Sequence, residues 1–191
     1  MLILDLDETL VFATEERLSY APDFQLEDYA IYCRPHLNPF LAQVFEWFQV
    51  AVWSSAGTSY VQEVIDLIFP NPNALEFVWS AKRCTQRYDA MESAFYWIKN
   101  LKKVKRRGFN LDQVLMIDDT PQKLEKNYGN LIRVRPFEGD RSDTELRDLC
   151  SFLDSLRTID NVRKVEKRNW RNSPLSKPLP PKPPPPATGD H

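Results

Sequence analysis

Cysteine is scarce in this sequence: Cys33, Cys84 and Cys150 are the only three in a chain of 191 residues. An odd number at such wide spacing fits neither a disulfide framework nor a zinc site, so we expect a reducing compartment. Long hydrophobic runs are also missing, since no window approaches the ~18 consecutive apolar residues that a membrane span requires. We therefore expect no membrane partner.

A strong charge imbalance and a targeting segment are absent as well. The formal net charge is −2, which gives no reason to expect a nucleic-acid partner. The apolar start at residues 1–4 is too short for a signal peptide and lacks a basic beginning and a cleavage site. We expect the fold to begin at residue 1 and the protein to be cytoplasmic, or nuclear if its source is eukaryotic.

Two hydrophobic periodicities alternate along the chain. Short apolar runs predict buried strands, and longer segments with apolar residues at helical spacing predict helices between them. The expected strands are residues 2–4, 29–33, 50–53, 77–79, 114–117 and 131–134, and the expected helices are residues 37–48, 59–69, 100–107 and 142–156. This alternation predicts an α/β, Rossmann-like fold with a mostly parallel sheet and helices on both faces.

The length and the composition of the C-terminal end predict one domain followed by a tail. We place the domain at residues 1–160 and a linker with a disordered, proline-rich tail at residues 161–191. Residues 173–186 are dominated by proline and favour polyproline II geometry. Such a segment is either a plain disordered tail or a ligand for a proline-binding domain of the SH3, WW or EVH1 kind.

Polar clusters follow three of the predicted strands directly. Because the carboxyl ends of parallel strands meet at one edge of a sheet, we expect these side chains to converge there. The clusters are Asp5 with Asp7, Ser54 with Ser55, and Asp118 with Asp119.

The carboxylates in these clusters need a counter-charge. Asp5 and Asp7 lie two residues apart beyond a buried strand, where two unpaired charges would repel each other and lose solvation. A divalent cation removes this conflict, and Asp118 and Asp119 supply further oxygen ligands. Mg²⁺ prefers such oxygen ligands and retains water or substrate phosphate in its shell. The sequence therefore predicts a magnesium site.

The same residues resemble a known family. Asp-Leu-Asp-Glu-Thr-Leu at residues 5–10 is similar to the first motif of the haloacid dehalogenase (HAD) superfamily, in the wording of its FCP/SCP branch of C-terminal-domain phosphatases. Arg-Pro-His at residues 34–36, Val-Trp-Ser-Ser at residues 52–55 and Met-Ile-Asp-Asp-Thr-Pro at residues 116–121 extend the resemblance over about residues 1–156. It implies a HAD-like phosphatase that uses Mg²⁺.

The resemblance implies the catalytic roles. Asp5 would attack phosphorus and carry an aspartyl-phosphate intermediate. Asp7 would protonate the leaving oxygen, activate the hydrolytic water and offer its backbone carbonyl to the metal. Asp119 would bind the metal together with Asp5, while Asp118 would support the site.

The remaining site residues would hold the phosphate and the loop. Ser54 would donate to the phosphoryl oxygens, with Ser55 left as the alternative. Lys99 would neutralise the charge of the phosphate and of Asp5, with Lys102, Lys103 and Lys105 as less suitable neighbours. Thr9 would fix the loop after the first strand.

The spacing between motifs leaves room for a minimal cap domain or none. An open site admits a side chain of a macromolecule, so we expect a phosphoprotein substrate carrying phosphoserine or phosphothreonine. Two alternatives remain: a phosphatase for small molecules or nucleic-acid 3′-phosphates, and a non-catalytic binding module or adaptor on the same fold. The aromatic residues at 45–48 and 95–97 are interpreted as core, and His36 as structural.

Overall fold

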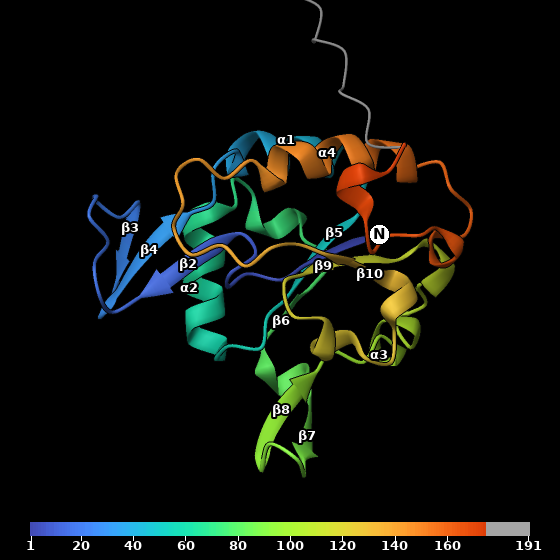
Figure 1. The fold of residues 1–191 in the computed structure, drawn as a ribbon, viewed down its shortest axis with the longest axis horizontal. Helices are drawn as coiled ribbons and strands as arrows, with labels where there is room; N and C mark the ends of the chain where they lie inside the picture. The colour runs from blue at the N-terminus through green and yellow to red at the C-terminus, as the bar shows by residue number, and fades with distance from the viewer. Residues whose placement is uncertain (175–191) are drawn as a thin grey trace, which may run out of the picture.

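A five-stranded parallel sheet runs through the middle of the molecule (Figure 1), in a computed structural model that describes residues 1–174. The strand order is β10-β9-β1-β5-β6. The strands are β1 (Leu2–Leu4), β5 (Val50–Trp53), β6 (Val78–Trp79), β9 (Leu115–Asp118) and β10 (Leu131–Arg133). Every residue of β1, β5 and β9 is buried, as expected for strands that are covered on both faces. The predicted fold class is confirmed.

Successive residues of the central strand β1 face different hydrophobic clusters, so the sheet is covered on both faces. Leu2 and Leu4 pack in the cluster that contains α1 (Leu37–Trp47), α2 (Thr58–Ile68) and α4 (Glu145–Leu156). Ile3 packs in the opposite cluster with α3 (Lys102–Lys105), which is shorter than the helix predicted over residues 100–107. The remaining helical segments are short 3-10 helices: η1 (Pro72–Ala74), η2 (Ala81–Arg83), η3 (Leu111–Gln113), η4 (Pro121–Leu124), η5 (Tyr128–Asn130), η6 (Val162–Lys164) and η7 (Trp170–Asn172).

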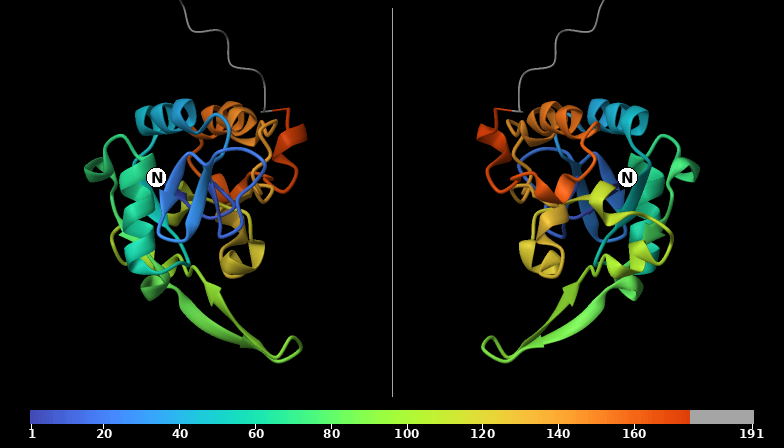
Figure 2. Two further views of the ribbon diagram at one scale, coloured as in Figure 1. Left: turned by 90° about the vertical axis from the view of Figure 1, so that its left-hand side faces the viewer. Right: turned by 90° about the vertical axis from the view of Figure 1, so that its right-hand side faces the viewer.

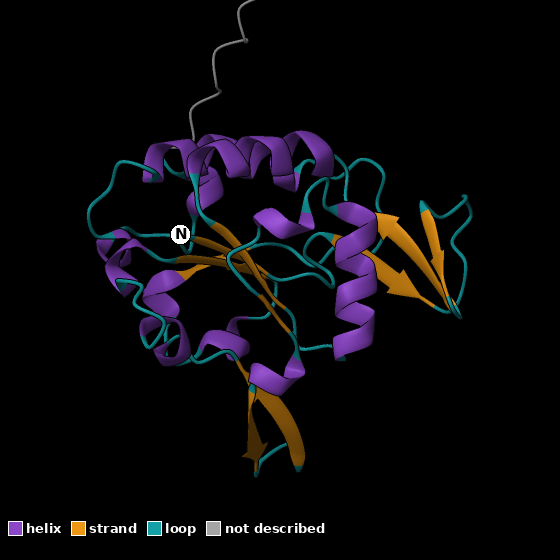
Figure 3. Cartoon of the chain, turned by 180° about the vertical axis from the view of Figure 1, so that it is seen from behind, coloured by secondary structure: helices purple, strands orange, loops and turns teal. Residues whose placement is uncertain are grey.

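Two small antiparallel sheets extend from the body on different sides (Figure 3). One consists of β2 (Val11–Thr14), β3 (Phe24–Leu26) and β4 (Tyr29–Cys33) in the order β2-β4-β3. The segment at residues 29–33 is thus a strand as predicted, but it lies outside the parallel sheet.

The second small sheet is a hairpin of β7 (Thr85–Asp89) and β8 (Ala94–Ile98), which projects from the body (Figure 2). Its strands pair only with each other among the described residues. The interpretation of residues 95–97 as core is therefore wrong for Phe95, which is 66% exposed, and for Trp97, which is 38% exposed. A two-stranded ribbon has no neighbouring layer that could cover these aromatic side chains.

The segment after α4 packs onto the domain. Val162 belongs to the main hydrophobic cluster, and the fully buried Trp170 stacks on Phe152 of α4 with its ring 5.8 Å away. The packed part of the chain therefore extends further than residue 160, where the sequence suggested its end. Residues 175–186 of the proline-rich segment lie outside the described residues. Between residues 1 and 174 there is no helix long and apolar enough to cross a membrane.

Candidate active site

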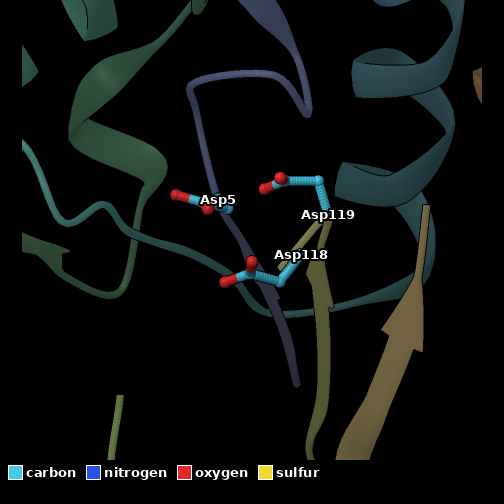
Figure 4. A group of neighbouring side chains, drawn as sticks. All are labelled: Asp5, Asp118 and Asp119. Atoms are coloured by element: carbon cyan, nitrogen blue, oxygen red, sulfur yellow. The ribbon is translucent and has the colours of Figure 1, made fainter. Parts of the chain in front are cut away.

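The parallel register brings the predicted acidic residues to one edge of the sheet. Leu4 of β1 lies opposite Ile117 of β9, so Asp5 and Asp118 follow side by side. Asp119 comes directly after β9, and a carboxylate oxygen from each of the three residues lies within 4.8 Å of the others. Figure 4 shows the three side chains gathered around a common space. The predicted convergence of the first and last acidic clusters is present in the structure.

Lys99 lies between two of these carboxylates. It follows β8, and its Nζ is 2.8 Å from Asp5 Oδ1 and 2.7 Å from Asp118 Oδ2. All three side chains are buried. Burial acts to raise the pKa of Asp5, but the charges of Lys99 and Lys123 outweigh it and hold this pKa below its usual value. The two lysines thus favour the ionised form of Asp5, which is the form that a nucleophile needs.

Asp118 and Asp119 have different surroundings. Burial and the nearby charge of Asp5 raise the pKa of Asp118 to about 7, and its Oδ1 accepts a bond from the backbone N–H of Thr120. Asp119 accepts a bond from the Thr120 hydroxyl at Oδ2, 2.7 Å away. Its other oxygen, Oδ1, is buried and has no hydrogen-bond partner among the described residues. A buried oxygen without a donor suits a metal ligand, so this donor set fits the implied Mg²⁺.

Asp7 has a separate environment. Its Oδ2 accepts a bond of 3.2 Å from Ser54 Oγ, and its Oδ1 accepts a bond of 2.5 Å from the Tyr60 hydroxyl. Burial raises the pKa of Asp7, while the Tyr60 hydrogen bond acts in the opposite direction. The carboxylate of Asp7 does not join the three-carboxylate group, which is consistent with a role in proton transfer.

Ser54 and Ser55 are distinguished by their contacts. Ser54 is fully buried, and its Oγ also accepts a bond of 2.9 Å from the backbone N–H of Ala56. Ser55 is half-buried. Ser54 is the serine whose hydroxyl bonds Asp7.

The loop after β1 is held by its own backbone hydrogen bonds and by the side chain of Arg34. This fully buried side chain donates to the backbone carbonyls of Thr9, at 3.1 Å, and Arg135, at 2.9 Å, and forms a bidentate pair with Asp143. The hydroxyl of Thr9 is buried without a hydrogen-bond partner among residues 1–174. The side chain of Thr9 thus makes no hydrogen bond to the loop, whereas Arg34 of the Arg-Pro-His motif does.

Two residues of the site were not predicted from the sequence. Tyr60 belongs to the first turn of α2 and reaches Asp7 across the loop that follows β5. Lys123 lies in η4, and its Nζ is 3.1 Å from Asp5 Oδ2, 3.8 Å from Asp118 Oδ1 and 3.7 Å from Asp119 Oδ1. Burial acts to lower the pKa of Lys123, but the three carboxylates outweigh it and raise this pKa above its usual value. The spacing of four residues from Asp119 was the available signal for Lys123.

The parallel sheet and the acidic residues at its carboxyl edge define a HAD-like α/β phosphatase domain. The family described as NLI interacting factor-like phosphatase matches residues 1–163. The chain belongs to this family, which is the FCP/SCP type that the motif at residues 5–10 predicted.

Individual relatives agree with this assignment. CTD nuclear envelope phosphatase 1 of Xenopus laevis is 30% identical over 184 residues, which cover 88% of this chain and 72% of the relative. Nuclear envelope morphology protein 1 of Saccharomyces cerevisiae is 27% identical, with 86% of this chain and 40% of that protein covered.

A solved structure shares the fold. The fission yeast RNA polymerase II CTD phosphatase Fcp1 bound to beryllium fluoride superposes with a TM-score of 0.54 and 24% identity. The match covers 75% of this chain and 43% of the Fcp1 chain. At this identity the likeness concerns the fold alone.

Proposed function

We propose that this phosphatase is a Mg²⁺-dependent phosphomonoester hydrolase that acts on phosphoserine and phosphothreonine in proteins through an aspartyl-phosphate on Asp5. The observation that carries the proposal is the pairing of an ionised Asp5 with a second carboxyl, Asp7, whose pKa is raised by burial. A nucleophile must be ionised, whereas a general acid must hold a proton near neutral pH. The two carboxyl groups are two residues apart, and their pKa values are shifted in the opposite directions that these two roles favour.

In the first step a carboxylate oxygen of Asp5 forms a bond to phosphorus, and the bond from phosphorus to the ester oxygen breaks. Asp7 gives its proton to the leaving serine or threonine oxygen. In the second step Asp7 takes a proton from water, the water oxygen attacks phosphorus, and the Asp5–phosphorus bond breaks to release phosphate. Asp5 and Asp7 thus return to their starting states.

The other residues orient the phosphate and balance charge. Lys99 holds Asp5 in place and offsets negative charge, which phosphoryl transfer requires at the equatorial oxygens. The hydroxyl of Ser54 can turn from Asp7 to a phosphoryl oxygen. Asp5, Asp119 and the backbone carbonyl of Asp7 would hold Mg²⁺, with Asp118 in support. When bound, the ion would supply further positive charge at the phosphoryl oxygens.

A phosphoprotein is favoured as substrate by the shape of the domain. The insertions into the α/β body are two small antiparallel sheets, β2-β4-β3 and β7-β8, with no helical cap between residues 1 and 174. The β7-β8 hairpin leads directly into Lys99 and exposes apolar side chains, including Tyr88 and Phe95. A hydrophobic surface connected to the site suits a protein segment better than a small metabolite.

The cellular location stays a prediction. The sequence suggests the cytoplasm, whereas several relatives, including the two described above, are named for the nuclear envelope. We propose that the protein works on the cytoplasmic or nuclear side of that envelope, and fractionation of cells that express the tagged chain tests this.

The central test is turnover of p-nitrophenyl phosphate by the wild type and by Asp5→Asn, with Mg²⁺ or with EDTA. We expect Asp5→Asn to lose on the order of 10³-fold or more in kcat and EDTA to abolish wild-type turnover. Asp112→Asn, at a partly exposed aspartate away from the site, is the control and should retain full activity. Zero turnover of both the wild type and Asp5→Asn would favour an adaptor.

The substrate class is tested separately. A phosphopeptide array and a panel of phosphorylated metabolites and 3′-phosphorylated oligonucleotides are assayed at equal Mg²⁺. Higher kcat/KM for phosphopeptides supports the proposal, and preference for any other group refutes it.

A further inference from the structure

Lys123 places an ammonium group among the three carboxylates of the candidate metal site. Its Nζ lies between 3.1 and 3.8 Å from one oxygen each of Asp5, Asp118 and Asp119. One of these atoms is Asp119 Oδ1, the buried oxygen without a hydrogen-bond partner. The amine therefore faces the oxygen that is best suited to bind a metal.

The two lysines of the site differ in their freedom to move. The side chain of Lys99 is 0% exposed and is held between Asp5 and Asp118. The side chain of Lys123 is 18% exposed, and two of its three carboxylate contacts, at 3.7 and 3.8 Å, are too long for hydrogen bonds. If Lys123 turns toward solvent it loses one hydrogen bond, the 3.1 Å bond to Asp5, whereas Lys99 cannot move without losing two close contacts.

A divalent ion and the Lys123 ammonium would repel each other at this position. Mg²⁺ binds carboxylate oxygens at about 2.0–2.1 Å. An ion bound to Asp5 Oδ2, which is 3.1 Å from the amine as it now stands, would be no further than roughly 5 Å from Nζ. Like charges at that separation in a buried site repel each other. The ammonium and the ion therefore compete for the same carboxylates.

We propose that Lys123 is a built-in counter-ion, which neutralises the carboxylates in the metal-free protein and must turn away before a divalent cation binds. The inference rests on the proposed function in one respect, namely that these carboxylates bind the ion. In this proposal Lys123 has a role distinct from that of Lys99. Lys123 sets the affinity of the site for the metal, and so the metal concentration at which the enzyme binds its ion.

The test is direct measurement of Mg²⁺ and Mn²⁺ binding by isothermal titration calorimetry, without substrate. Lys123→Met removes the charge and keeps an unbranched side chain, and we expect its Kd to fall about tenfold or more relative to the wild type. Lys126→Met is the matched control, because Lys126 is an exposed lysine three residues further on. Lys123→Gln repeats the test with a polar side chain, and circular dichroism checks that each variant is folded.

Thermal unfolding in EDTA gives a second readout. Without its counter-ion the carboxylate group repels itself, so metal-free Lys123→Met should melt below the wild type and gain more from added Mg²⁺. The inference is supported if both Lys123 variants bind the metal more tightly than the wild type while Lys126→Met binds it as the wild type does. It is also supported if the two Lys123 variants bind the metal and the wild type and Lys126→Met show no binding.

Equal Kd values in the wild type and the Lys123 variants would overturn the inference and leave the proposed function standing. Weaker binding by the variants would also overturn it, because Lys123 would then assist the metal. Absence of binding in every folded protein would refute the metal requirement of the proposed function, and the inference with it.

Discussion

Asp7 illustrates how one side chain decides the chemistry at the residue scale. Its two oxygens accept bonds from Ser54 and Tyr60, and burial raises its pKa. The Tyr60 bond stabilises the ionised form and so limits that rise. The environment of Asp7 therefore balances the need to hold a proton against the need to release it.

Tyr60→Phe tests this balance. The substitution removes the hydrogen bond that favours the carboxylate, so the pKa of Asp7 should rise further. Because a general acid loses its proton as pH rises through its pKa, the alkaline limb of the kcat profile should move to higher pH. The measurement is kcat for p-nitrophenyl phosphate between pH 5 and 9. Tyr128→Phe, an exposed tyrosine, is the control. A Tyr60→Phe profile that overlays the wild type would show that this bond does not tune Asp7.

The site could be predicted from the sequence only in part. Asp5 and Ser54 directly follow apolar strands and Asp118 ends one. The rule that the carboxyl ends of parallel strands meet at one edge of a sheet is enough to bring the three residues together. Lys123 and Tyr60 reach the site from η4 and α2, and their positions depend on the angle at which each segment packs. Local patterns carry no information about that angle.

At the element scale, the β7-β8 hairpin departs most from the sequence prediction. Phe95, Tyr96 and Trp97 form an apolar run that is indistinguishable from a core strand by composition. Whether this run is buried depends on its surroundings. The two strands of the hairpin pair with each other, and Phe95 and Tyr88 remain exposed with their rings 5.1 Å apart. Exposed aromatic residues of this kind are candidates for a contact surface, as proposed above for the substrate protein.

A double substitution, Tyr88→Ser with Phe95→Ser, tests whether the hairpin binds the substrate protein. Loss of two apolar contacts should raise KM for a phosphopeptide substrate about tenfold. Turnover of p-nitrophenyl phosphate should stay within about twofold of the wild type, because this small substrate does not reach the hairpin. Tyr128→Ser provides a matched control at an exposed tyrosine elsewhere. Unchanged phosphopeptide kinetics would assign the hairpin to another partner.

At the scale of the whole molecule, the parallel sheet was predictable and the end of the domain was not. Strands that are buried on both faces, such as β1 and β9, contain an uninterrupted run of apolar residues. Few other elements of secondary structure require such a run, so it identifies these strands. Residues 161–174 are mostly polar and contain isolated apolar residues such as Val162 and Trp170. Nothing in this local composition indicates that the segment folds back over α4.

Trp170 shows what this segment contributes to the stability of the domain. Its ring is fully buried on Phe152, and its Nε1 donates a bond of 2.8 Å to the carbonyl of Arg133 in β10. Trp170→Ala would leave a cavity and remove this hydrogen bond, so we expect a loss of about 3–5 kcal/mol in the free energy of unfolding. Trp97→Ala, the same change at a 38% exposed position, should cost far less. Urea unfolding of both variants measures the difference. If Trp170→Ala lowered the free energy of unfolding no more than Trp97→Ala does, residues 161–174 would contribute little to the stability of the domain. If the two decreases differ as expected, a chain cut at residue 160 would lack part of its core.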